Sequence, residues 1–191
     1  MKKNMLRTAR AGKALLLACL VWAVTSCATT DMGGSTGGSG TGTGATSTAQ
    51  ADQAFIETAA GGQQLRLRLS EVAVQKTANL EAREFAKAVV TNHTKSVAEL
   101  KGIAQQLRVT YPMALPSGRQ AVYDRVTQLT GSDFDRAFAR EMELAYQQDI
   151  ALYQNSATAA GNLALRGFII KTTPVLQGQL RLATQLKNIL P

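Results

Sequence analysis

His93 is the only histidine in this chain of 191 residues, and an imidazole could carry a proton near neutral pH or bind a metal ion. The apolar residues Phe85, Val89, Val97 and Leu100 surround it at intervals of three and four residues. This spacing predicts one face of an α-helix, so His93 is expected to lie in a packed interior. Acid–base catalysis or metal binding would therefore need polar partners from neighbouring helices.

The two cysteines lie in an N-terminal segment that is typical of export. Residues 1–13 hold five basic residues and no acidic one, and the mostly apolar run over residues 14–24 is too short to span a bilayer. These features predict a signal peptide over residues 1–26, and Cys19 would be removed with it. The sequence Val-Thr-Ser-Cys that ends at Cys27 resembles the lipobox of bacterial lipoproteins, which implies that Cys27 is lipidated. An ordinary signal peptide with an incidental cysteine is the alternative.

Lipidation of Cys27 would leave the mature domain without a thiol for a disulfide, a redox site or a cysteine-based metal site. Five of the 21 basic residues and none of the 13 acidic ones precede Cys27, so the net charge falls from +8 to +3. So small a charge argues against a nucleic-acid partner. The expected partner is the membrane, through the lipid on Cys27. By resemblance to the sorting signals of Gram-negative lipoproteins, Ala28 implies the outer membrane, with the domain facing the periplasm.

A second segment separates this anchor from the folded part. Residues 28–49 are almost wholly Gly, Ser, Thr and Ala, and such a stretch cannot bury enough apolar surface to order itself. With Cys27 it predicts a disordered tether over residues 27–49. The folded domain is then expected over residues 50–191, a length that can hold one hydrophobic core.

Apolar residues recur at intervals of three and four throughout that domain, which predicts an all-α fold. The expected helices run over residues 52–76, 79–108, 118–129 and 132–160, and from 162 into the C-terminal residues 187–191. The expected capping residues are Asp52, Asn79, Ser117, Ser132 and Asn162. Pro174 falls inside the last pattern and predicts either a kink or the start of a fresh turn. The sequence therefore predicts a bundle of four main helices and one short crossover helix.

Several fragments of this domain resemble a known family. They are Ala59-Ala60-Gly61-Gly62, Phe85-Ala86 through Asn92-His93, the run over residues 131–138 with Met142, and Phe168 with Thr173-Pro174-Val175-Leu176. In order and spacing they are similar to the ferritin-like domain-of-unknown-function family of exported bacterial proteins, over about residues 52–188. The resemblance implies a ferritin-like antiparallel four-helix bundle. It implies no particular reaction.

Members of that family typically have a histidine in each of three helices, and this chain departs from the pattern. Only His93 matches, because the other two positions fall on Tyr146 and Gln179. The family's acidic positions in the first helix fall near Arg66 and Arg68. A carboxylate-bridged di-metal site needs about four carboxylates and two histidines facing inward, so the sequence assigns no metal and no cofactor.

His93, Tyr146 and Gln179 nevertheless lie on the apolar faces of three different expected helices. We interpret them as a polar layer of the core that satisfies its own hydrogen bonds and fixes the helix register. A small-molecule pocket and a metal site are the alternatives. Of the acidic residues, only Asp149 comes near the inner face of its helix.

Two classes of function follow from these features. The first, which the sequence favours, is a membrane-anchored lipoprotein whose non-catalytic helical domain binds a partner or takes part in the envelope-stress response. The partner, a protein or the cell wall, is not assigned. The second is a ferritin-like metal-binding or oxidase-type protein. No catalytic residue is assigned, because the expected mature domain lacks a free cysteine nucleophile, a second histidine and a phosphate-binding loop.

Overall fold

The computed structural model describes residues 42–190, with side chains from Ser47 onward. Five helices make up this part of the chain: α1 (Gly42–Lys76), α2 (Leu80–Gln106), α3 (Ser117–Gln128), α4 (Gly131–Ser156) and α5 (Leu163–Ile189). Residues 42–190 contain no strand, so the predicted all-α class is confirmed. None of these helices is both long enough and apolar enough to cross a membrane. The expected signal peptide and Cys27 lie outside the described residues.

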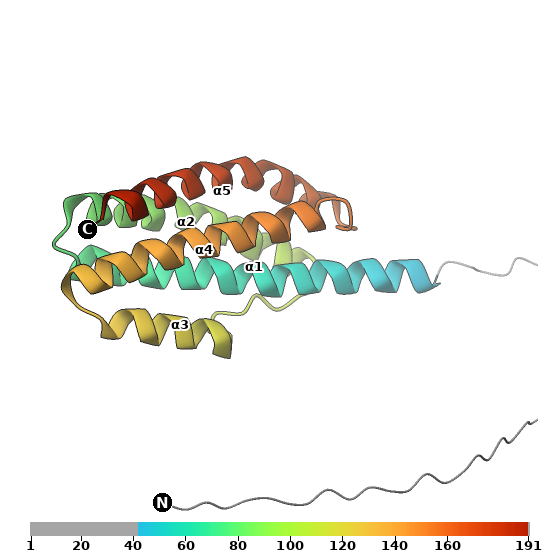
Figure 1. The fold of residues 1–191 in the computed structure, drawn as a ribbon. Coiled ribbons are helices and arrows are strands. Elements are labelled where there is room, and N and C mark those ends of the chain that lie inside the picture. The colour runs from blue at the N-terminus through green and yellow to red at the C-terminus, as the bar shows by residue number, and fades with distance from the viewer. Residues whose placement is uncertain (1–41, 191) are drawn as a thin grey trace, which may run out of the picture. The chain divides into compact units, whose positions relative to one another are not determined.

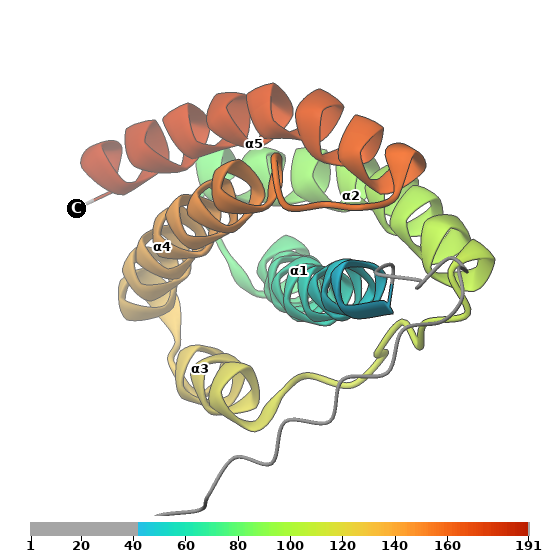
Figure 2. The same cartoon turned by 90° about the vertical axis from the view of Figure 1, so that its right-hand side faces the viewer.

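The long helices pack in pairs around a common core. α1 packs mainly against α2, and α4 packs mainly against α5, while α1–α4 and α2–α5 contacts join the two pairs. The short helix α3 packs against α1 and α4 (Figure 2). α1 therefore has neighbours on three sides, and residues 59–66 are buried without interruption. A helix covered in this way must bury its polar residues as well as its apolar ones.

Small residues in α1 let its neighbours come close. A Cβ at Gly61 would lie 3.1 Å from Cγ of Pro116, which belongs to the connection between α2 and α3. Aromatic side chains fill the space further along: the rings of Phe55 and Tyr153 lie 4.9 Å apart, and those of Phe85 and Phe138 lie 6.1 Å apart. Edge-on ring pairs of this kind add to the stability that burial provides.

The start of α1 differs from the prediction. The helix begins at Gly42, ten residues before the start expected at Asp52, so it includes residues 42–49 of the segment expected as a tether. These early turns have a packing partner, because the Cβ of Thr48 lies 2.8 Å from where a Cβ of Gly161 would be. Asp52 does not cap α1. Its carboxylate accepts hydrogen bonds from the backbone N–H groups of Gly161 and Asn162, at 2.9 and 3.0 Å, and so fixes the turn between α4 and α5.

Two of the other predicted caps are confirmed and two were wrong. The side chains of Asn79 and Asn162 accept from the N–H groups of Ala82 and Leu165, at 2.9 and 3.0 Å. Ser117 and Ser132 lie within the first turns of α3 and α4, where Pro116 and Thr130 occupy the N-cap positions without a side-chain cap. Gly131 has a positive φ of 56°, a conformation that glycine adopts without strain, and this allows α4 to begin directly after Thr130.

The last helix continues through its proline. Pro174 lies inside α5, and the helix follows an arc in Figure 2. Proline lacks the N–H that would bond four residues back, so a bend at this point is the expected adjustment. α4 ends at Ser156 rather than near Ala160 as predicted, and a turn follows in which the N–H of Ala160 donates to the Ser156 carbonyl at 3.0 Å.

Candidate functional site

A buried arginine lies at the centre of the described helices. Arg66, on the fully covered part of α1, is 1% exposed and is among the largest completely buried side chains. A charge in such a position is costly unless it is paired and hydrogen-bonded. The groups that surround Arg66 therefore define the chemistry of the core.

Three side chains from two other helices hold the guanidinium. Its Nε donates to Nε2 of His93 on α2 at 3.0 Å, and its Nη1 donates to Oδ2 of Asp149 on α4. The carbon of the guanidinium lies 5.0 Å from the ring centroid of Tyr146, also on α4. A carboxylate, an imidazole and an aromatic face thus share one cation, which combines a charge-assisted hydrogen bond with a cation–π contact.

The contact with Arg66 determines the state of His93. An arginine can only donate, so Nε2 of His93 accepts and the ring proton lies on Nδ1. Burial lowers the pKa of His93 well below 6.5, and the nearby charge of Arg66 lowers it further. His93 is therefore a neutral acceptor whose Nε2 is already occupied.

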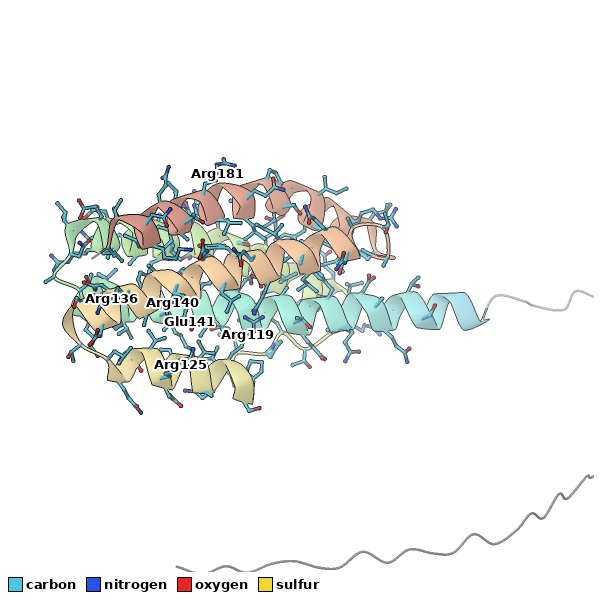
Figure 3. The ribbon with its side chains drawn as sticks, in the orientation of Figure 1. Arg119, Arg125, Arg136, Arg140, Glu141 and Arg181 are labelled. Carbon is cyan, nitrogen blue, oxygen red and sulfur yellow. The ribbon has the colours of Figure 1, made fainter. Side chains whose placement is uncertain are left out.

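A second arginine approaches the same carboxylate. Arg119 projects from α3 toward α1, and its Nη2 lies 3.9 Å from Oδ1 of Asp149 (Figure 3). α3 is also linked to α4 at the surface, where Nη2 of Arg125 donates to Oε1 of Glu141 at 2.6 Å. Two cations thus share one buried carboxylate, and the cluster of Arg66, Arg119 and Asp149 carries a net positive charge.

Tyr146 completes this cluster as a neutral phenol. Burial raises the pKa of Tyr146 to about 12, and the charge of Arg66 opposes part of that rise. The hydroxyl is fully buried and has no hydrogen-bond partner among the described residues. With so high a pKa, it cannot act as a base near neutral pH.

Two of the three predicted site residues, His93 and Tyr146, contact Arg66, and Gln179 lines a pocket together with Arg66. Within the described residues no hydrogen bond joins His93, Tyr146 and Gln179; Arg66 lies between His93 and Tyr146 and contacts both. Sequence reasoning placed no partner on Arg66. Two features of the sequence could have indicated the pair of Arg66 and Asp149. Arg66 follows Gly62 by one helical turn, and Asp149 lies near the inner face of a helix that was expected to pack against the helix of Arg66.

His93 and Gln179 line one pocket of about 320 Å³ between α2 and α5, and Arg66 of α1 also lines it. Its deeper part includes the buried side chains of Arg66, His93 and Thr172. Its rim carries the exposed side chains of Lys95, Glu99 and Lys171. The Nζ of Lys171 lies 2.5 Å from Oε1 of Glu99, so an ion pair bridges α2 and α5 at the rim.

The core does not suit a metal ion. No group of three or more His, Cys, Asp or Glu side chains that could hold a metal occurs in residues 47–190. Nε2 of His93 and Oδ2 of Asp149 both accept hydrogen bonds from Arg66, so these two potential ligand atoms are already bonded to a guanidinium cation. Copper and zinc sites need several such atoms directed at one point.

Comparisons with known proteins give a family and a fold. A family model described as "Domain of unknown function (DUF4142)" matches residues 38–186. The search of curated proteins gave no match. Among solved structures, the chain is similar to "CopM in the Cu(II)-bound form" and "CopM in the Cu(I)-bound form", each with a TM-score of 0.61, 20% identity, and coverage of 72% of this chain and 95% of that one.

The chain is also similar to the Ag-bound form of CopM, with 20% identity, a TM-score of 0.58 and the same coverage of both chains. At this identity the likeness concerns the fold alone, since one fold can carry unrelated sites. The metals named for CopM are therefore properties of that protein.

Proposed function

The chain belongs to the DUF4142 family, and from this premise we propose that it is a non-catalytic binding module of the bacterial cell envelope, which takes up a small organic anion in the pocket between α2 and α5. The observation that carries the proposal is the charge of the pocket wall. Arg66, Lys95 and Lys171 line it, and Glu99 is its only acidic lining residue among those described. Such a wall attracts anions and repels cations.

The rim can open at small cost. Lys171 and Glu99 are 63% and 41% exposed, and ion pairs between exposed groups contribute about 0–1 kcal/mol. An incoming carboxylate can replace Glu99 as the partner of Lys171. None of the ion pairs among the described residues involves Lys95, so its charge is available to a ligand without that exchange. The pocket volume, about 320 Å³, suits a small molecule rather than a folded partner.

The pocket lacks the groups for catalysis. Its one imidazole, His93, already accepts at Nε2 from Arg66, so it is poorly placed to remove a proton from a substrate. No cysteine occurs in residues 47–190 to act as a nucleophile. The ferritin-like metal-binding or oxidase-type alternative lacks a ligand set in the same residues. Binding without turnover is the function that these side chains support.

The remaining parts of the proposal come from the sequence. Residues 1–26 are a lipoprotein signal peptide, and lipid on Cys27 holds the domain at the outer membrane, facing the periplasm. The helices α1, α2, α4 and α5 form a ferritin-like antiparallel four-helix bundle, with α3 as its crossover helix. Incorporation of labelled palmitate tests the anchor in the native host. The label should be lost in Cys27→Ala, and an unlabelled wild type would contradict the anchor.

The binding function is tested by calorimetry of the mature chain with succinate and with the neutral succinamide. Succinate should bind and succinamide should not, and binding should weaken as salt is added. Lys95→Gln should reduce the affinity several-fold. Lys101→Gln is the matched control, because Lys101 lies on the same helix and does not line the pocket. Elemental analysis of protein purified without chelators tests the metal-binding alternative. Near-stoichiometric copper or iron, together with no anion binding, would overturn the proposal.

A further inference from the structure

The outer side of α5 is rich in exposed apolar side chains. Eight large apolar residues are exposed among the described residues, and five of them belong to α5: Leu163, Ile170, Val175, Leu182 and Ile189. α5 packs against α4 and α2 and lies at the outside of the helices in Figure 1 and Figure 2. Single exposed apolar residues are ordinary, whereas a set gathered on one element marks an interaction surface.

These five side chains share one face of the helix. At 3.6 residues per turn their positions fall within an arc of about 140° around α5. The buried positions Leu165, Leu176 and Ala183 fall on the opposite side and contribute to the core. Exposed apolar residues occur from the first turn of α5 to the last, so the apolar face extends along the whole helix.

The same helix is basic. α5 contains Arg166, Lys171, Arg181 and Lys187 and no acidic residue. Lys171 pairs with Glu99 of α2, and Lys187 pairs with Glu143 of α4. Arg181 is exposed and takes part in none of the ion pairs among the described residues.

The guanidinium of Arg181 lies on the apolar face itself. A Cβ at Gly178, one turn earlier in α5, would be 3.7 Å from Nη2 of Arg181, and the side chain projects away from the other helices in Figure 3. The long stem of an arginine can cover apolar surface while its charged end reaches a polar layer. The outer face of α5 therefore combines apolar side chains with an accessible cation.

This combination fits the surface of an anionic membrane. We propose that the outer face of α5 binds a bilayer that contains anionic phospholipids, with its apolar side chains in the headgroup region and Arg181 at the phosphates. None of the described helices can span a bilayer, so the contact would lie in the plane of the interface. A second copy of the chain fits less well, because a two-fold contact would place the Arg181 side chains of both copies against helices without an acidic residue.

Vesicle flotation of the mature chain with Cys27→Ser tests the proposal. This chain has no site for the proposed lipid, so it reports binding by the domain alone. It should float with vesicles of phosphatidylglycerol and phosphatidylcholine in equal amounts, and at least ten-fold less with phosphatidylcholine alone. Added salt should weaken the binding.

Two matched pairs of variants locate the contact. Ile170→Gln with Leu182→Gln should weaken binding at least ten-fold, whereas Leu80→Gln with Leu144→Gln should not. The second pair lies on α2 and α4 and is similarly exposed, at 64% and 44% against 61% and 46%. Lys171 and Val175 are kept, because they also line the pocket between α2 and α5.

A second comparison tests the cation. Arg181→Gln should weaken binding to the anionic vesicles about five-fold, the effect of one basic residue at a charged membrane surface. Arg140→Gln is the control, because Arg140 is exposed on α4 and also takes part in none of the ion pairs among the described residues. Equal losses in the two variants would contradict a specific contact of Arg181.

The outcomes separate this inference from the proposed function. Absence of flotation by the folded chain, or equal losses in the two double variants, would overturn membrane binding by α5. A dimer in sedimentation that Ile170→Gln with Leu182→Gln dissociates, together with no flotation, would show that the face binds a second copy instead. Succinate binding and palmitate labelling are measured separately, so neither depends on these results.

Discussion

Gly62 of α1 and Asp149 of α4 are in such close contact that a Cβ at Gly62 would lie 2.5 Å from Oδ1 and 2.7 Å from Oδ2 of the carboxylate. Arg66 follows Gly62 by one helical turn, and its Nη1 donates to that same carboxylate. The absent side chain at position 62 thus provides the space in which a buried ion pair forms. A glycine that weakens α1 as an isolated helix contributes to the core through this contact.

Gly62→Ala should therefore destabilise the protein. The added methyl group would force Asp149 away from Arg66 or α4 away from α1, at a cost of about 1–3 kcal/mol for overpacking. Gly102→Ala is the matched control, because nothing lies within 4 Å of a Cβ at Gly102 in α2. It should stabilise the protein by about 0.5–1 kcal/mol, the usual preference for alanine in a helix. Urea unfolding measures both changes, and stabilisation by Gly62→Ala would contradict the contact.

Asp149→Ala should be among the most damaging single changes in the core. It would leave Arg66, which is 1% exposed, without its carboxylate, and breaking a buried pair in this way costs about 3–5 kcal/mol. Replacing both partners, as in Arg66→Met with Asp149→Leu, should recover most of that loss, because the stranded charge is then gone. Unfolding midpoints with an unchanged m-value measure the effect. A double variant as unstable as Asp149→Ala would show that the pair itself stabilises the fold.

His93→Ala should cost about 1–3 kcal/mol of unfolding free energy, since Nε of Arg66 would lose its buried acceptor. His93→Gln supplies an amide oxygen near the same place and should lose less. The comparison of the two thermal melts separates the lost acceptor from the lost volume. A melting temperature that is unchanged in His93→Ala would contradict the buried hydrogen bond.

Periodicity was sufficient to predict the helices, because an amphipathic face leaves a regular pattern in any chain. The two asparagine caps were also predictable, since the Asn79 and Asn162 side chains act within three residues of themselves. The role of Asp52 was not, because its partners lie 109 and 110 residues away. Local sequence alone cannot distinguish a carboxylate that caps its own helix from one that caps a distant turn.

The centre of the site was missed for a related reason. A charged residue on an otherwise apolar helix is ordinarily expected at the surface, and Arg66 is buried only because α1 is covered on three sides. His93 was correctly expected to be buried, since its neighbours at intervals of three and four are apolar. The hydrogen-bond partner of His93 is Arg66 and not Tyr146 or Gln179. This pairing depends on how α1, α2 and α4 pack together, which the sequence of one helix does not determine.

The single histidine makes the pH dependence of stability a direct test of the core. Unfolded His93 should titrate near pH 6.5, whereas in the folded protein burial and the charge of Arg66 hold its pKa well below that value. As the pH falls through 6.5, the unfolded chain takes up a proton that the folded chain does not. The unfolding free energy should therefore be constant above about pH 7 and should fall below pH 6.5, by up to about 1.4 kcal/mol per pH unit.

His93→Gln removes this proton and should flatten the profile between pH 5 and 7, where no other side chain has an ordinary pKa. The charged groups around the imidazole are Arg66 on α1 with its partner Asp149 on α4, and Lys95, Glu99 and Lys171, which line the same pocket; all of them stay in place in the variant. Urea unfolding at half-unit pH steps gives both curves. A wild type that gains stability on acidification would mean that folded His93 binds the proton more tightly than the unfolded chain does. That result would contradict the hydrogen bond from Arg66 to Nε2, because a protonated imidazole has no acceptor to offer.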